Sequence, residues 1–206
     1  MGPATERQRA VISVIIPTHN NERTLVPCFA ALVPAVSTGV LRDVVVADGG
    51  SHDDTVAVSD AAGCTIIADP AARDLGVRLR RAAAEARADW LLFLRPDIVL
   101  EDGWGAAVEA FAAAAGRRGS VAAAAAAFRY AVDADGALPR LAEWQASVAR
   151  VVRGRVRPEQ GLLVHRRLYD AVGRHPDGAM ADHRLLSRLG RKVGLLRSRA
   201  FVQHGG

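Results

Sequence analysis

Polar side chains follow three of the four short apolar runs in the first half of the chain, at the points where these runs end. Thr18 and Asn20 follow the first run, Asp48 follows the second and Asp97 the fourth. Ligands of open α/β sheets bind at the carboxyl ends of parallel strands, so these groups would share one ligand-binding edge. Asp48 would there accept hydrogen bonds from a base or ribose, the alternative being a turn residue or helix cap. Gly49 lets the backbone approach a ligand closely.

The turn after the first run excludes several nucleotide-binding classes. A dinucleotide fold has Gly-x-Gly-x-x-Gly at this turn, and a P-loop has Gly-x-x-x-x-Gly-Lys-Ser/Thr. This chain has Pro17-Thr-His-Asn20 instead. The turn therefore supports neither a Rossmann dehydrogenase nor a P-loop phosphotransferase. A nucleotidyltransferase would show a glycine-rich turn that carries Lys or Arg, which is also missing.

The elements that position these groups follow from hydrophobic periodicity. Continuous β-branched or apolar runs predict buried strands, and apolar residues three and four apart predict helices. Strands are expected at 11–16, 44–46, 64–67, 90–94, 121–130, 161–164 and 193–202, and helices at 25–33, 55–62, 77–88, 104–115, 138–152, 166–172 and 182–189. Alternating strands and helices predict an α/β fold with a Rossmann-like, mostly parallel sheet flanked by helices.

We expect a single domain over residues 11–206 after a disordered terminus at 1–10. Residues 11–130 would form the nucleotide-binding half and residues 131–206 the acceptor-side half.

Composition narrows the choice of partner. The 206 residues carry a formal net charge of +5, from 27 basic and 22 acidic residues, and 5% are aromatic. A nucleic-acid-binding protein concentrates such charge in one dense stripe, usually beside aromatic side chains. Here the arginines are scattered, so no nucleic-acid partner is expected. Diffuse positive charge suits a phosphate-bearing small molecule or an anionic membrane surface, and a solvated arginine-rich surface is the plain alternative.

The cysteines and the hydropathy pattern bear on location. Cys28 and Cys64 give neither a disulfide framework nor metal-ligand spacing. No stretch approaches the roughly 20 apolar residues of a membrane span. We expect a soluble, cytoplasmic protein, with peripheral membrane contact left open.

Five segments, in order and spacing, resemble the family 2 glycosyltransferases of the GT-A fold. They are SVIIPTHN (13–20), VVVADGGSHDDT (44–55), LFLRPD (92–97), EQGLLVHRRLYDAVG (159–173) and ADHRLLSRL (181–189). The likeness is strongest to small, soluble bacterial members that lack transmembrane segments. The resemblance implies transfer of a sugar from a nucleoside diphosphate sugar to an acceptor hydroxyl, on a small molecule, a glycan or a lipid, with inversion.

The resemblance also implies roles for individual residues. The turn that begins at Pro17, together with Asp48, would bind base and ribose. Asp97 matches the last Asp of the family's Asp-x-Asp metal motif, and His204 stands where many GT-A enzymes place a metal-binding His. Asp182 matches the catalytic base.

The implied chemistry explains these residue types. The departing diphosphate needs its charge neutralised, and oxygen ligands with one imidazole suit Mg²⁺ or Mn²⁺. A carboxylate such as Asp182 takes the acceptor's proton as the hydroxyl attacks. The arginines Arg73, Arg78 and Arg80 are expected to contact phosphates as bidentate donors, unless they form a solvated helix face.

Two departures from the family pattern favour an alternative. Arg95 replaces the first residue of the metal motif, and Ala181 replaces the Glu that usually precedes the base. The alternative is a catalytically impaired protein of the same fold that binds a nucleotide sugar or acts as a scaffold. We expect the remaining histidines to lie in loops or on the surface; these include His165 and His175.

Overall fold

The computed structural model describes residues 12–68, 74–132 and 156–203. An eight-stranded sheet forms its centre, with the strand order β3-β2-β1-β4-β7-β6-β8-β5. The strands are β1 (Ile12–Thr18), β2 (Leu41–Asp48), β3 (Thr65–Ala68), β4 (Trp90–Phe93), β5 (Ile98–Leu100), β6 (Ala125–Val132), β7 (Leu162–His165) and β8 (Val193–Val202). The terminus expected to be disordered and the helix expected at 138–152 lie outside the described residues.

The sheet divides into a parallel part and a mixed part. Strands β3, β2, β1 and β4 run parallel, whereas β7 is antiparallel to both β4 and β6. Beyond β7, β6 and β8 are parallel, and β5 is antiparallel to β8. Four of the seven pairings among the described residues are therefore parallel. The α/β fold is confirmed, and the parallel order holds for the neighbouring strands β3, β2, β1 and β4.

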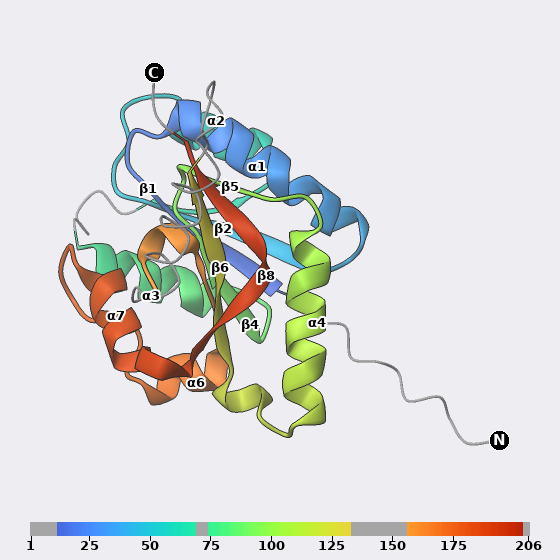
Figure 1. Ribbon diagram of the computed structural model, residues 1–206. Coiled ribbons are helices and arrows are strands. Elements are labelled where there is room, and N and C mark those ends of the chain that lie inside the picture. Colours follow the sequence, from blue (N-terminus) through green and yellow to red (C-terminus); the bar gives the residue numbers. More distant parts are fainter. Residues whose placement is uncertain (1–11, 69–73, 133–155, 204–206) are drawn as a thin grey trace, which may run out of the picture.

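Helices cover both faces of this sheet. They are α1 (Glu22–Ser37), α2 (Thr55–Ala61), α3 (Leu75–Glu85), α4 (Trp104–Arg117), α6 (Arg166–Ala171) and α7 (Ala181–Leu189). In Figure 1, α4 lies on one side of the sheet, and α3, α6 and α7 lie on the other. No helix in the described part of the chain is long and apolar enough to cross a membrane.

Alternating side chains of the strands fill two hydrophobic clusters. Val14 and Ile16 of β1 belong to the cluster beneath α1 and α4, and Ile15 belongs to the one beneath α3, α6 and α7. This alternation follows from the period of two in a strand. The continuous apolar run of β1 was predicted to be buried on both faces, and it is.

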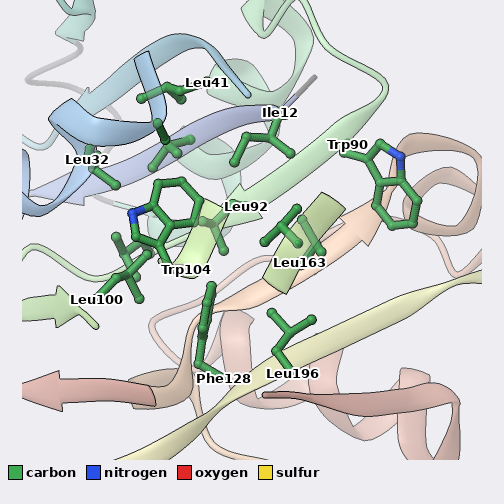
Figure 2. Packing of buried hydrophobic residues seen from close by; sticks show 14 of the residues in the cluster. Ile12, Leu32, Leu41, Trp90, Leu92, Leu100, Trp104, Phe128, Leu163 and Leu196 are labelled. Atoms are coloured by element: carbon green, nitrogen blue, oxygen red, sulfur yellow. The ribbon is translucent and has the colours of Figure 1, made fainter. Parts of the chain in front are cut away.

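Trp104 occupies the middle of the first cluster. Its indole N–H donates a hydrogen bond of 2.8 Å to the carbonyl of Ala31 in α1. Figure 2 shows the ring surrounded by Leu92, Leu100 and Phe128. A buried indole with a satisfied N–H packs α4 firmly against α1.

Two features of the sheet differ from the sequence-based expectations. The three-residue strand β5 was not predicted, because a segment this short shows no periodicity. The strand expected at 121–130 starts four residues later, since Val121–Ala123 forms a turn of 3-10 helix. Ala125, Ala126 and Ala127 of β6 are buried between β7 and β8, and this packing overrides the helical preference of alanine.

Candidate active site

Asp48 closes the turn at the end of β2. Its carboxylate accepts hydrogen bonds from the hydroxyls of Thr18 (2.9 Å) and Ser51 (2.5 Å), and from the backbone amides of Gly50 (2.8 Å) and Ser51 (2.9 Å). Burial alone would raise the pKa of Asp48, but the hydrogen bonds from Ser51, Thr18 and Gly50 outweigh it and hold the pKa below its ordinary value. Asp48 is thus an ionised organiser of this turn, and its contact with base or ribose stays a prediction.

The loops after β1 and β2 are joined by reciprocal hydrogen bonds. The Asn20 side-chain oxygen accepts a hydrogen bond from the backbone amide of His52 (2.8 Å), and the backbone amide of Asn20 donates one to the Ser51 hydroxyl (2.9 Å). Asn20 has a φ of 56°, in the left-handed region that asparagine tolerates. The sequence did not single out Ser51, although it lies in the Asp-Gly-Gly-Ser turn.

Arg78 of α3 lies directly behind Gly49. Its Nη1 donates to the carbonyls of Thr18 (2.8 Å) and Ala47 (3.0 Å), one at the end of β1 and one at the end of β2. A Cβ atom on Gly49 would stand 2.5 Å from this nitrogen, so any larger residue here would displace the guanidinium from the two carbonyls. Arg78 therefore supports the backbone of the turn, and a phosphate contact by this side chain stays a prediction.

Asp97 follows β4 and is held by an arginine fork. Arg95 donates from Nε (3.0 Å) and Nη2 (2.8 Å) to the two oxygens of Asp97, and from Nη1 to Glu159 (3.1 Å). Burial would lower the pKa of Arg95, but Asp97 and Glu159, with a smaller effect from Asp182, raise it above its usual value. A permanent cation thus sits among three carboxylates.

The end of β8 also reaches Asp97. The backbone amide of Gln203 donates to the Asp97 carbonyl at 2.8 Å. The predicted metal ligand His204 comes next in the chain, but it lies outside the described residues. Within residues 12–68, 74–132 and 156–203, no group of three or more His, Cys, Asp or Glu side chains could hold a metal ion.

Asp182 stands in the first turn of α7 with its side chain 22% exposed. One of its oxygens lies 3.1 Å from Nε2 of His175, whose side chain is completely buried. His165 is buried at the end of β7, so the expectation of a loop or surface position is wrong for it. His175 does lie in a loop, between α6 and α7, but its side chain is buried. No sequence pattern points to His175, because its loop packs against β4 and α6 only in the folded chain.

A pocket lies between the carboxyl end of β1 and Asp182. Pro17, Arg95 and Asp182 line it together with apolar side chains from β4, β7 and α7. The end of β1, the arginine that holds Asp97 and the predicted base Asp182 thereby line one pocket, and their roles in binding and catalysis stay predictions.

The two other predicted phosphate-binding arginines are placed differently. Arg80 donates to the carbonyl of His175 (2.6 Å) and to the carboxylate of Asp177 (2.5 Å), so it ties α3 to the segment before α7. Arg73 lies outside the described residues. A phosphate contact by either side chain stays a prediction.

Comparison with known proteins gives the geometry a context. The model of the family described as glycosyl transferase family 2 matches residues 13–189. No curated protein matches the chain.

Glucosyl-3-phosphoglycerate synthase from Mycobacterium tuberculosis, solved with Mn²⁺, UDP and glucosyl-3-phosphoglycerate, is similar in structure. The TM-score is 0.62 and the identity 21%, over 97% of this chain and 72% of that one. Residues 1–349 of Staphylococcus aureus TarS, solved with UDP-GlcNAc, are similar with a TM-score of 0.67 and 16% identity, over 95% of this chain and 60% of that one. At these identities, the likeness to the solved structures is one of fold.

Proposed function

The chain belongs to glycosyl transferase family 2 and is a glycosyltransferase, and from this premise we propose that it transfers a sugar from a nucleoside diphosphate sugar to an acceptor hydroxyl, with inversion. The observation that carries the proposal is the pocket that joins Pro17, at the end of β1, to Arg95 and Asp182. It gives the donor's phosphates a cation and gives the acceptor a carboxylate within one space.

A UDP-sugar is the first donor to test. The mycobacterial synthase has been solved with UDP-glucose, and TarS with UDP-GlcNAc. In this chain, the base and ribose would lie against the joined loops after β1 and β2, at Thr18, Asn20 and Asp48. The acceptor is proposed only as a hydroxyl-bearing small molecule, glycan or lipid.

A divalent metal at Asp97 is the part of the proposal that needs the largest local change. Carboxylate oxygens suit Mg²⁺ and Mn²⁺, and the mycobacterial synthase was solved with Mn²⁺. Both oxygens of Asp97 are engaged by Arg95, so a metal ion there would replace at least one bond of the fork. When bound, the ion would neutralise the negative charge that develops on the departing diphosphate. His204, next to Gln203, is the proposed second ligand.

Asp182 is the proposed base. The acceptor O–H bond breaks as its oxygen attacks the anomeric carbon, the proton passes to the Asp182 carboxylate, and the diphosphate leaves with the electrons of its bond to the sugar. Asp182 lines the pocket and has an exposed fraction of 22%, so a substrate can reach it.

Two observations favour the alternative of an impaired, nucleotide-sugar-binding protein. Arg95 donates hydrogen bonds to both carboxylate oxygens of Asp97. Ala181 offers no carboxylate beside the proposed base Asp182. Such a protein would bind the donor without turning it over.

A thermal-shift panel of UDP-, GDP- and dTDP-sugars, with and without Mn²⁺, tests binding, because a ligand of the native state raises Tm. A donor-turnover assay on the same protein then separates enzyme from scaffold. Asp182→Asn is expected to keep the thermal shift and to lose turnover by about 100-fold or more. Asp170→Asn, which removes an exposed carboxylate paired with Arg174, is the control and should match the wild type. Turnover left intact in Asp182→Asn would show that the base is assigned wrongly.

Location and membrane contact complete the proposal. The free thiols of Cys28 and Cys64 support a reducing compartment, and we place the activity in the cytoplasm. Val26, Val33 and Val36 on α1 are exposed, and they are the side chains to substitute when peripheral membrane contact is tested.

A further inference from the structure

His175 lies in the segment between α6 and α7, beneath the sheet. Its ring packs edge-on against Phe93 of β4, with 4.6 Å between ring centroids, and against Tyr169 of α6 at 5.4 Å. Its side chain has no exposed surface. A buried imidazole needs partners for both of its nitrogens, and His175 has them.

The two partners determine which nitrogen carries the proton. The Tyr169 oxygen accepts the backbone amide of His175 (3.3 Å) and lies 2.9 Å from Nδ1. An ionised carboxylate only accepts hydrogen bonds, so the 3.1 Å contact between Asp182 Oδ1 and Nε2 assigns the imidazole proton to Nε2. Nδ1 is then the acceptor for the Tyr169 hydroxyl, which stays protonated because burial raises its pKa to about 12.

Helix α3 holds the backbone on either side of this imidazole. Arg80 donates to the carbonyl of His175, and the carboxylate of Asp74 accepts the amide of Gly178 at 2.6 Å. Gly76 approaches Pro176 so closely that a Cβ on it would stand 1.9 Å from the carbonyl oxygen. The backbone that carries the imidazole therefore cannot move without displacing the first turns of α3.

We propose that His175 is a positioning residue for Asp182, and this inference rests on the proposed function. The Nε2–H bond fixes one carboxylate oxygen, so that the other stays at the pocket to take the acceptor's proton. His175 keeps its own proton throughout. The Arg95 cation, which lines the same pocket, attracts the Asp182 carboxylate as well.

His175→Phe tests this role, because phenylalanine keeps an aromatic ring against Phe93 and Tyr169 but cannot donate to Asp182. We expect kcat to fall about 10- to 100-fold while the donor KM stays within about twofold, since the carboxylate loses its orientation but the donor site is untouched. His175→Gln restores an N–H donor and should recover part of the loss. The control is His183→Phe, which changes the exposed histidine next to Asp182.

Two results would overturn the inference. One is a kcat within about twofold of the wild type in a folded His175→Phe variant. The other is an NMR spectrum of the wild-type imidazole, assigned by its absence in His175→Phe, that shows the proton on Nδ1. The spectrum needs no substrate. The wild type is assayed first, so absence of turnover there refutes the proposed function, whereas turnover retained in His175→Phe refutes only the role of His175.

Discussion

Gly76→Ala is the substitution for which the structure predicts the sharpest local effect. Gly76 stands in the first turn of α3, and the added Cβ would meet the Pro176 carbonyl oxygen at 1.9 Å and its carbon at 2.8 Å. Contacts of this kind start at about 3 Å, so the Pro176 segment must retreat by roughly 1 Å. Overpacking of this severity costs about 2–3 kcal/mol, and alanine returns up to about 1 kcal/mol of helix propensity.

The net loss is therefore about 1–2 kcal/mol in the free energy of unfolding. For a chain of this size, each kcal/mol shifts Tm by about 2–4 °C, so Tm should fall by about 2–8 °C. Turnover should fall as well, because the displaced segment carries His175. Circular dichroism melts and urea titrations measure the stability, and the donor-turnover assay measures the activity.

Gly105→Ala is the matched control. Gly105 is also a buried helical glycine, but its added Cβ would lie in ordinary contact, 3.6 Å from Ala35 and 3.9 Å from Val40. This variant should be as stable as the wild type, or more stable by up to about 1 kcal/mol. Equal stability of the two variants would refute the close approach of α3 to Pro176.

Three further predictions concern the metal, the pH dependence and the thiols. Arg95→Gln frees the Asp97 carboxylate and should raise its affinity for Mn²⁺ about fivefold, or by about 1 kcal/mol, because a partly exposed ion pair contributes no more than that. Isothermal titration calorimetry measures the affinity, and an unchanged or weaker affinity would contradict the prediction. The lowered pKa of Asp48 means that its carboxylate stabilises the fold above the unfolded-state pKa of about 4, and that this stability is lost as pH falls through the folded pKa. Asp48→Asn should hence be less stable than the wild type in urea at pH 7, with a gap that narrows below pH 4; a gap that widens in acid would be the wrong sign. Burial raises the pKa of Cys28 to about 12 and that of Cys64 to about 11, so a disulfide reagent at pH 8 should label both rapidly only in denaturant.

The parallel part of the fold was predictable because its signals are local. Each strand from β1 to β4 reads as an apolar run, and polar side chains follow the runs of β1, β2 and β4, so their shared edge follows from order alone. β8 was predicted at 193–202 and has these bounds. β5 and the start of β6 were not predictable in this way, because their positions depend on strands that are distant in sequence.

The site was predictable in its positions and less so in its contacts. Asp48, Asp97 and Asp182 were found from motifs, but the partners that define their chemistry lie far along the chain. His175 reads as a loop residue until its loop is folded under β4. Arg78 reads as a helix-surface residue until Gly49 is seen in front of it. A side chain's hydrogen-bond partners are a tertiary property that one sequence does not display.

Helix α3 contacts both sides of the site through side chains only two positions apart. Arg78 holds the carbonyls under Gly49, and Arg80 holds the segment that carries His175. A ligand that shifts Gly49 would therefore also shift helix α3, which holds the segment that carries His175, the partner of Asp182. Occupancy of the donor side and occupancy of the acceptor side would then alter each other's affinity by the same factor, as thermodynamic reciprocity requires. Helix α3 would transmit this coupling between the donor-binding side and the acceptor-binding side of the site.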